Sequence, residues 1–143
     1  MCEQHNFTFD VDRAYEDQLV AVLEASPTHP IGAPQAPQTF GVYVLYWDGV
    51  TVYVGQARNL RNRLRDHLRK IQGRQGIDAA DVTCKYLTIA RLWEVARAED
   101  VLITRFEPEW NGIPGFSSHA PGRGRPGMAG YVNQWDQRFP PIN

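Results

Sequence analysis

Apolar and polar residues alternate on both sides of the dipeptide Asp48-Gly49, and this pattern predicts a β-hairpin. The flanking runs, 41–47 and 50–55, are rich in valine and tyrosine, which favour strands. An Asp-Gly pair suits a type I′ turn because both central residues of that turn need a positive φ. Tyr43 and Tyr53 therefore stand on opposite strands of an antiparallel pair, where both side chains can project from one face.

Two later stretches have the period of a helix. Leu60, Leu64, Leu68 and Ile71 form one apolar stripe, and Asn59 suits its N-cap. Residues 91–106 form the longest predicted helix, whose apolar side comprises Leu92, Val95, Ala96, Leu102, Ile103 and Phe106. Between the helices, 77–81 predicts a loop or a short helical turn and the alternating run 82–89 predicts a third strand.

The N-terminal part predicts one more helix and a connector. The apolar positions over 12–25 have helical spacing, with Asp10 or Asp12 at the start of the helix. Residues 26–37 contain four prolines and predict an extended connector over the surface. The expected fold is α+β, a short antiparallel sheet flanked by helices. We expect one domain, with an N-terminal helix and connector (1–38), a core (39–111) and an irregular C-terminal extension (112–143), where aromatic residues recur too often for a solvated tail.

Composition places the chain among ordinary globular proteins, with 43% hydrophobic and 22% charged residues in 143. No run is long enough to span a membrane and no signal peptide pattern is present, so we expect a cytoplasmic protein. Two cysteines are too few for a disulfide framework or a zinc site. The net charge is −1, yet one short window opposed only by Asp66 holds Arg58, Arg61, Arg63, Arg65, Arg69, Lys70 and Arg74. Such a local patch predicts nucleic-acid binding better than the total charge does.

Glu99 is a carboxylate within the apolar stripe of the longest helix. Burying an unpaired charge costs on the order of several kcal/mol, so a buried Glu needs a cation or strong donors. One interpretation is a ligand for a hard divalent ion such as Mg²⁺. The other is a residue at the edge of the stripe, paired with an arginine. The spacing alone leaves both interpretations open.

Six positions together resemble the GIY-YIG nuclease superfamily. Gly41-Val42-Tyr43 and Tyr53-Val54-Gly55 match its two tripeptides, and Arg63, His67, Glu99 and Asn111 match its later positions in the same order. The extension resembles that of the type II restriction endonucleases in this superfamily, through Trp110-Asn111, Gly115-Phe116, the run from His119 to Arg125, and Trp135-Asp136.

The resemblance implies hydrolysis of DNA phosphodiesters with one Mg²⁺ or Mn²⁺ ion per active site, held by Glu99. It makes Tyr43 the general base or the group that orients the attacking water, with Tyr53 bonded to the phosphate or the water. Because a phenol with a pKa near 10 is a poor base, Arg63 is expected to favour its phenolate and to hold the phosphate. His67 either receives the proton of Tyr43 or holds that residue in place. Asn111 orients the metal site or the following loop.

The implied partner is double-stranded DNA. Gly55 is expected to let the DNA backbone approach closely. Phosphate contacts are expected from His119 and from Arg58, Arg61, Arg65, Arg69 and Lys70, and base contacts from Arg123 and Arg125. If the recognition site is palindromic, a homodimer is expected. The alternatives are a less specific repair, phage or mobile-element nuclease, and a DNA-binding module without catalysis.

Overall fold

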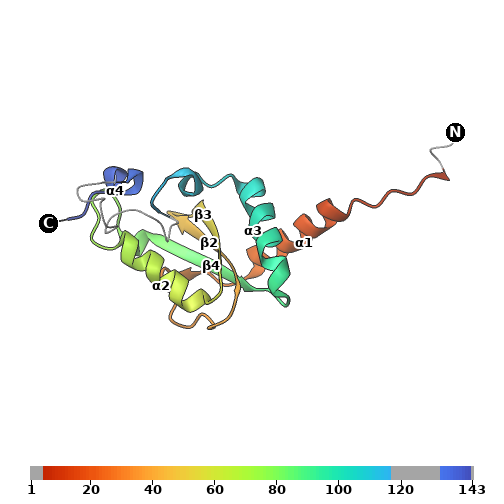
Figure 1. The fold of residues 1–143 in the computed structure, drawn as a ribbon, viewed down its shortest axis with the longest axis horizontal. Coiled ribbons are helices and arrows are strands. Elements are labelled where there is room, and N and C mark those ends of the chain that lie inside the picture. The colour runs from red at the N-terminus through yellow and green to blue at the C-terminus, as the bar shows by residue number, and fades with distance from the viewer. Residues whose placement is uncertain (1–4, 117–132, 143) are drawn as a thin grey trace, which may run out of the picture.

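A four-stranded antiparallel sheet lies at the centre of the computed structural model, which describes residues 5–116 and 133–142 (Figure 1). The order of its strands is β1-β4-β2-β3, so β2 is interior and β3 is an edge strand. The bounds of the strands are His29–Pro30 for β1, Gly41–Trp47 for β2, Val50–Ala57 for β3 and Val82–Thr88 for β4.

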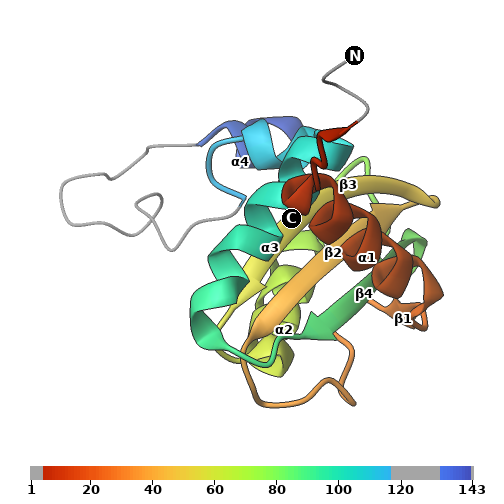
Figure 2. The same cartoon turned by 90° about the vertical axis from the view of Figure 1, so that its right-hand side faces the viewer.

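Helices cover both faces of this sheet. The helices α1 (Val11–Ala25) and α3 (Leu92–Phe106) pack on one face, and α2 (Leu60–Ile71) packs on the other (Figure 2). Shorter helices are η2 (Ala79–Asp81), η3 (Glu109–Gly112) and α4 (Gln134–Arg138). The predicted α+β class is therefore confirmed. None of the helices within the described residues is long and apolar enough to cross a membrane.

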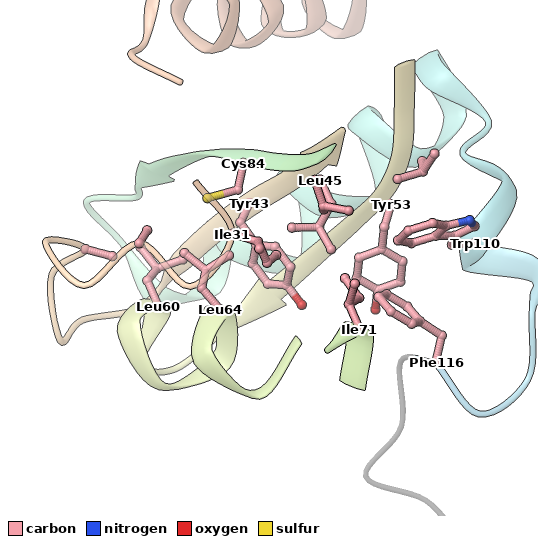
Figure 3. Close-up of a cluster of buried hydrophobic side chains, with 14 of the residues drawn as sticks. Ile31, Tyr43, Leu45, Tyr53, Leu60, Leu64, Ile71, Cys84, Trp110 and Phe116 are labelled. Atoms are coloured by element: carbon pink, nitrogen blue, oxygen red, sulfur yellow. The ribbon is translucent and has the colours of Figure 1, made fainter. Parts of the chain in front are cut away.

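Alternation along β2 and β3 sorts their side chains between the two faces. Val42, Val44 and Val54 are buried against α1 and α3. Tyr43 and Tyr53 belong to the cluster on the α2 face, and Figure 3 shows both rings on that side of the sheet. The two tyrosines therefore share a face, as the hairpin pattern predicts.

Local signals act as expected at the hairpin and at the helix starts. Asp48 and Gly49 have φ values of 51° and 82°, both positive as a type I′ turn requires. The Asn59 side chain accepts a hydrogen bond of 3.0 Å from the backbone N–H of Asn62 and caps α2. Asp10 caps α1 in the same way, through the N–H of Arg13 at 3.0 Å.

The connector at 26–37 differs from its prediction, because much of it is packed rather than draped over the surface. Within it β1 pairs with β4, placing His29 opposite Cys84. Ile31, Ala33 and Ala36 are buried in the same cluster as the two tyrosines. Proline is tolerated here since β1 lies at the sheet edge, where a missing N–H breaks no ladder.

The described part of the C-terminal extension folds back onto the core. Trp135 and Phe139 are buried beside Trp110. Arg74 forms an ion pair with Asp136 and donates to the Phe139 carbonyl at 3.0 Å. The aromatic residues of this end thus contribute to the core, as their spacing predicts. His119, Arg123 and Arg125 lie outside the described residues, so their roles stay predictions.

Candidate active site

The Tyr43 hydroxyl is the meeting point of three predicted site residues. It lies 2.6 Å from His67 Nε2, and Arg63 Nε donates to it over 3.3 Å. Arg63 and His67 are one turn apart on α2, which is why both reach the same oxygen. Because a guanidinium can only donate, the Tyr43 oxygen is the acceptor in its contact with Arg63.

Burial keeps Tyr43 protonated. The side chain is fully buried, and this desolvation raises the pKa of Tyr43 well above its ordinary 10.0, with a further contribution from Tyr53. The charge and hydrogen bond of Arg63 act in the opposite direction, as expected from the sequence, but burial outweighs them. The Tyr43 phenolate that we expected from the sequence is therefore not favoured in this arrangement.

Arg63 stays a cation in this half-buried position. Burial opposes its charge, but interaction with Tyr43 and then with Tyr53 raises the pKa of Arg63 above its usual range. A permanent positive charge thus lies directly beside the Tyr43 oxygen, and its planar fork of donors suits a phosphate.

Phe116 packs against the rings of both His67 and Tyr53. The imidazole of His67 stacks on Phe116, with centroids 4.8 Å apart and planes at 22°. The ring of Tyr53 meets Phe116 edge-on at 4.9 Å. The ring of Trp110 packs edge-on against Phe116 at 5.0 Å, and Figure 3 shows Tyr53, Trp110 and Phe116 together. Aromatic packing of this kind fixes the orientation of His67 and Tyr53.

Gly55 lies directly against the tyrosines. A Cβ atom at this position would lie 2.3 Å from the Tyr43 hydroxyl oxygen and 2.9 Å from Cε2 of Tyr53. Gly55 is itself buried. Its lack of a side chain is therefore explained by the Tyr43 ring, which passes close over the backbone here, rather than by the approach of DNA. The contact of Gly55 with DNA stays a prediction.

Asn111 holds the edge strand next to the tyrosines. Its Oδ1 accepts from the Val54 N–H at 2.9 Å, and its Nδ2 donates to the Val54 carbonyl at 2.8 Å. Val54 lies between Tyr53 and Gly55 on β3, so Asn111 satisfies two polar groups of an otherwise unpaired edge. The amide therefore positions β3.

Glu99 is half-buried on α3 and accepts a hydrogen bond of 3.2 Å from Gln56 Nε2. Burial first, and then the nearby charge of Asp100, raise the pKa of Glu99 above its ordinary 4.5. Within 5–116 and 133–142, no lysine or arginine forms an ion pair with it. A desolvated carboxylate without such a partner fits a hard cation, since a bound cation would favour its charged form.

The cation would have few protein ligands. No group of three or more His, Cys, Asp or Glu side chains lies close enough together in the described part of the chain to hold a metal ion. An ion on Glu99 would therefore complete its coordination with water and phosphate oxygens, which is how Mg²⁺ is commonly bound.

A cleft of about 650 Å³ joins the two halves of the site. One wall comes from the end of β3 and the start of α2, and the other from the first turns of α3. Arg63 lines this cleft and also contacts Tyr43, while Gln56 lines it and also contacts Glu99. The remaining lining residues are Ala57, Arg58, Asn59, Asn62, Asp66, Leu92, Trp93, Val95 and Ala96.

The basic residues predicted to bind DNA fall into two groups. Arg58, Arg65 and Arg69 are exposed. Arg61 instead donates to the Ala36 carbonyl at 2.7 Å, and Lys70 donates to the carbonyls of Gly115 and Phe116 at 2.9 and 2.5 Å. Burial and the charge of Arg63 lower the pKa of Lys70 to about 8. The last two head groups therefore bind the protein itself, and their contact with DNA stays a prediction.

Three residues of this site carry no strong sequence signal. Gln56 is recognisable only as the residue after the second tripeptide, and Phe116 only as part of Gly115-Phe116. Trp93 looks like one more apolar residue of a helix. Their places at the site depend on tertiary packing.

A comparison of the chain with models of known protein families identifies the family to which it belongs. The family model described as the Eco29kI GIY-YIG domain matches residues 48–141, more than half of the chain. The chain belongs to this GIY-YIG family. The resemblance of the chain to the GIY-YIG superfamily is thereby confirmed.

This GIY-YIG domain is also similar, over part of its length, to UvrABC system protein C of two bacteria. It is 33% identical over 79 residues to UvrABC system protein C of Deinococcus radiodurans, and 34% identical over 84 residues to that of Treponema denticola. These matches cover 54% and 55% of the chain but only 13% of each relative.

Among solved structures, the domain is similar to the GIY-YIG N-terminal endonuclease domain of UvrC from Thermotoga maritima, bound to its catalytic divalent cation, magnesium. Identity is 28% and the TM-score is 0.43, over 55% of this chain and 89% of that one. A point mutant of the same domain gives 28% and 0.44, over 55% and 88%.

Proposed function

We propose that this GIY-YIG domain hydrolyses phosphodiester bonds of duplex DNA with one divalent metal ion, Mg²⁺ or Mn²⁺. The supporting observation is the arrangement around the cleft. Arg63 lines this cleft and contacts Tyr43, which in turn contacts His67. Gln56 also lines the cleft, and it contacts the desolvated carboxylate of Glu99. This arrangement brings a phosphate-binding cation, an acid–base pair and a metal ligand to one place.

Arg63 controls access to Tyr43. It lines the cleft, whereas Tyr43 is fully buried behind it. The 3.3 Å contact between them is long for a hydrogen bond and easily given up. A phosphate in the cleft draws the Arg63 guanidinium to itself, and the Tyr43 oxygen then becomes open to the attacking water.

Proton transfer through Tyr43 avoids a free phenolate. With neutral His67 unprotonated at Nε2, the Tyr43 hydroxyl donates to that nitrogen across 2.6 Å. As water adds to phosphorus, its proton passes to the Tyr43 oxygen while the phenol's own proton passes to His67. The ester P–O bond breaks, the departing oxygen takes a proton from solvent, and His67 returns its proton to solvent. This relay is compatible with the raised pKa of Tyr43.

Glu99 would hold the metal ion, and Gln56 would hold Glu99 in place. When bound, the ion supplies Lewis-acid stabilisation of the phosphate and the leaving oxygen.

We further propose that cleavage is site-specific, as in a restriction endonuclease. The match to the Eco29kI GIY-YIG domain supports it, because that match extends to residue 141 and so includes the C-terminal extension. The extension (112–143) would read the DNA through His119, Arg123 and Arg125, and a homodimer would match a palindromic site. The second candidate is a repair nuclease, supported by the 33% identity to UvrABC system protein C.

The test compares wild type with Glu99→Ala on supercoiled plasmid, with Mg²⁺ and with chelator, following cleavage and binding together. We expect Mg²⁺-dependent cleavage by the wild type and binding without cleavage by the variant. Glu94→Ala is a matched control, since Glu94 is a carboxylate on α3 that is already paired with Arg91, at 3.9 Å. Discrete fragments support a restriction enzyme and nicking or smearing supports the repair type. Unchanged cleavage by Glu99→Ala refutes the metal site.

A further inference from the structure

Two large apolar side chains at the start of α3 face solvent instead of the core. Leu92 is 53% exposed and Trp93 is 69% exposed. The buried residues of this helix are Val95, Ala98 and Leu102, so the core-facing stripe begins only after Trp93. A tryptophan this exposed contributes little to the hydrophobic core, so packing does not explain why a large aromatic residue stands at this position.

The surroundings of Trp93 are those of a polar and cationic cleft. Trp93 and Leu92 form part of one wall, and Arg58, Arg63 and Asn62 form part of the opposite wall. Among partners that combine negative charge with flat apolar faces, nucleic acid fits this pairing: its phosphates suit the arginines and its bases suit an indole.

Trp93 and Glu99 lie on the same helix. Six residues of helix rise about 9 Å along its axis, so Trp93 is within the length of a few nucleotides of the residue proposed to hold the metal ion.

We infer that Trp93 binds DNA, stacking on a nucleobase at a partly opened base step beside the cut, with Leu92 next to it. This inference rests on the proposed function, since it places DNA in the same cleft. Apolar side chains inserted at base steps are a known way for proteins to hold and bend DNA. Trp93 is thus a positioning residue for the DNA strand, and takes no part in proton transfer.

The experiment measures binding of a fluorescein-labelled duplex by anisotropy in chelator, so that no cleavage occurs. Stacking on one base contributes a factor of about 5 to 150 in affinity. We expect Trp93→Ala to lose that factor, Trp93→Phe to keep most of the affinity, and Trp93→Leu to lose nearly as much as alanine. Phe7→Ala is the matched control, because Phe7 is an exposed aromatic residue on the N-terminal segment and does not line the cleft.

Tryptophan emission provides an independent measurement. Trp110 and Trp135 are buried and Trp47 is half-buried, so Trp93 is the tryptophan most open to a ligand. We expect DNA to quench the emission of wild type, and Trp93→Phe to lose most of that quenching.

Three results would overturn the inference. The first is equal DNA affinity of wild type and Trp93→Ala, and the second is wild-type emission that saturating DNA leaves unchanged. The third is a change in oligomeric state on gel filtration with unchanged DNA affinity, which would make Trp93 part of a protein interface. If the wild type still cleaves plasmid in these cases, the inference fails alone; if it neither binds nor cleaves DNA, the proposed function fails with it.

Discussion

Replacing Gly55 by alanine tests the geometry around Tyr43 with a single methyl group. The added Cβ would lie 2.3 Å from the Tyr43 hydroxyl oxygen and 2.5 Å from its Cζ. Gly55 is not among the residues with positive φ, so its backbone conformation suits alanine. The substitution therefore acts through contact with Tyr43 first, and with Tyr53, whose Cε2 would lie 2.9 Å away.

The size of the effect follows from these distances. Ordinary contact begins near 3.4 Å, so the Tyr43 hydroxyl must move by about 1 Å. A move of this size away from His67 lengthens the 2.6 Å contact to about 3.6 Å, beyond hydrogen-bond range. A misplacement of about 1 Å costs about 100-fold in rate. Overpacking of the core costs about 1–3 kcal/mol, and each kcal/mol lowers Tm by about 2–4 °C in a protein of this size.

The assay is plasmid cleavage under single-turnover conditions, alongside DNA binding and a thermal melt. Gly112→Ala is the control, because a Cβ on Gly112 meets no atom within 4 Å and its φ is also not positive. We expect Gly55→Ala to bind DNA, to melt a few degrees lower and to cleave about 100-fold more slowly, while Gly112→Ala behaves as wild type. Cleavage by Gly55→Ala at the wild-type rate would refute the placement of Tyr43 in the reaction.

Three more substitutions test other contacts. The raised pKa of Glu99 means that the folded state binds the Glu99 proton more tightly than the unfolded state does, so stability falls as the pH rises above the ordinary pKa of 4.5. In chelator at pH 7, Glu99→Gln should therefore melt at a higher temperature than wild type. Added Mg²⁺ should raise the Tm of wild type only. Asn111→Ala leaves the Val54 N–H and carbonyl without their partner and should cost about 1–3 kcal/mol in urea unfolding, with faster amide exchange at Val54 and unchanged exchange in α1 as the contrast. Folding lowers the pKa of Lys70 from 10.5 to about 8. Between about pH 8 and pH 10.5 the folded state therefore binds fewer protons than the unfolded state, and stability should rise with pH across this window. Lys70→Met should lack that rise, and an identical pH profile in both proteins would contradict the burial of Lys70.

The hairpin and the long helices could be predicted because their signals are local. A type I′ turn depends on Asp48-Gly49 alone, and the start of α2 on Asn59 and the leucine spacing. The shared face of Tyr43 and Tyr53 follows from alternation once the turn is known.

The rest could not be predicted because it depends on contacts between distant segments. The pairing of β1 with β4 joins residues more than fifty positions apart, and nothing in the proline-rich connector indicates it. A cluster of basic residues shows that charge is present but not where each side chain points, so Arg61 was not distinguishable from Arg58. The raised pKa of Tyr43 likewise depends on complete burial, which no local pattern reveals.

The aromatic packing behind the site has a consequence for the order in which the protein becomes active. Tyr43, Tyr53 and His67 are translated early, but Phe116 and the Trp135 ring packed on it at 4.3 Å come many residues later. A chain still emerging from the ribosome therefore holds the reactive groups without the support that orients them. If the proposed function holds, we therefore expect the nascent chain to gain activity only once residues 133–142 have been made and packed, so that synthesis itself delays cleavage of DNA.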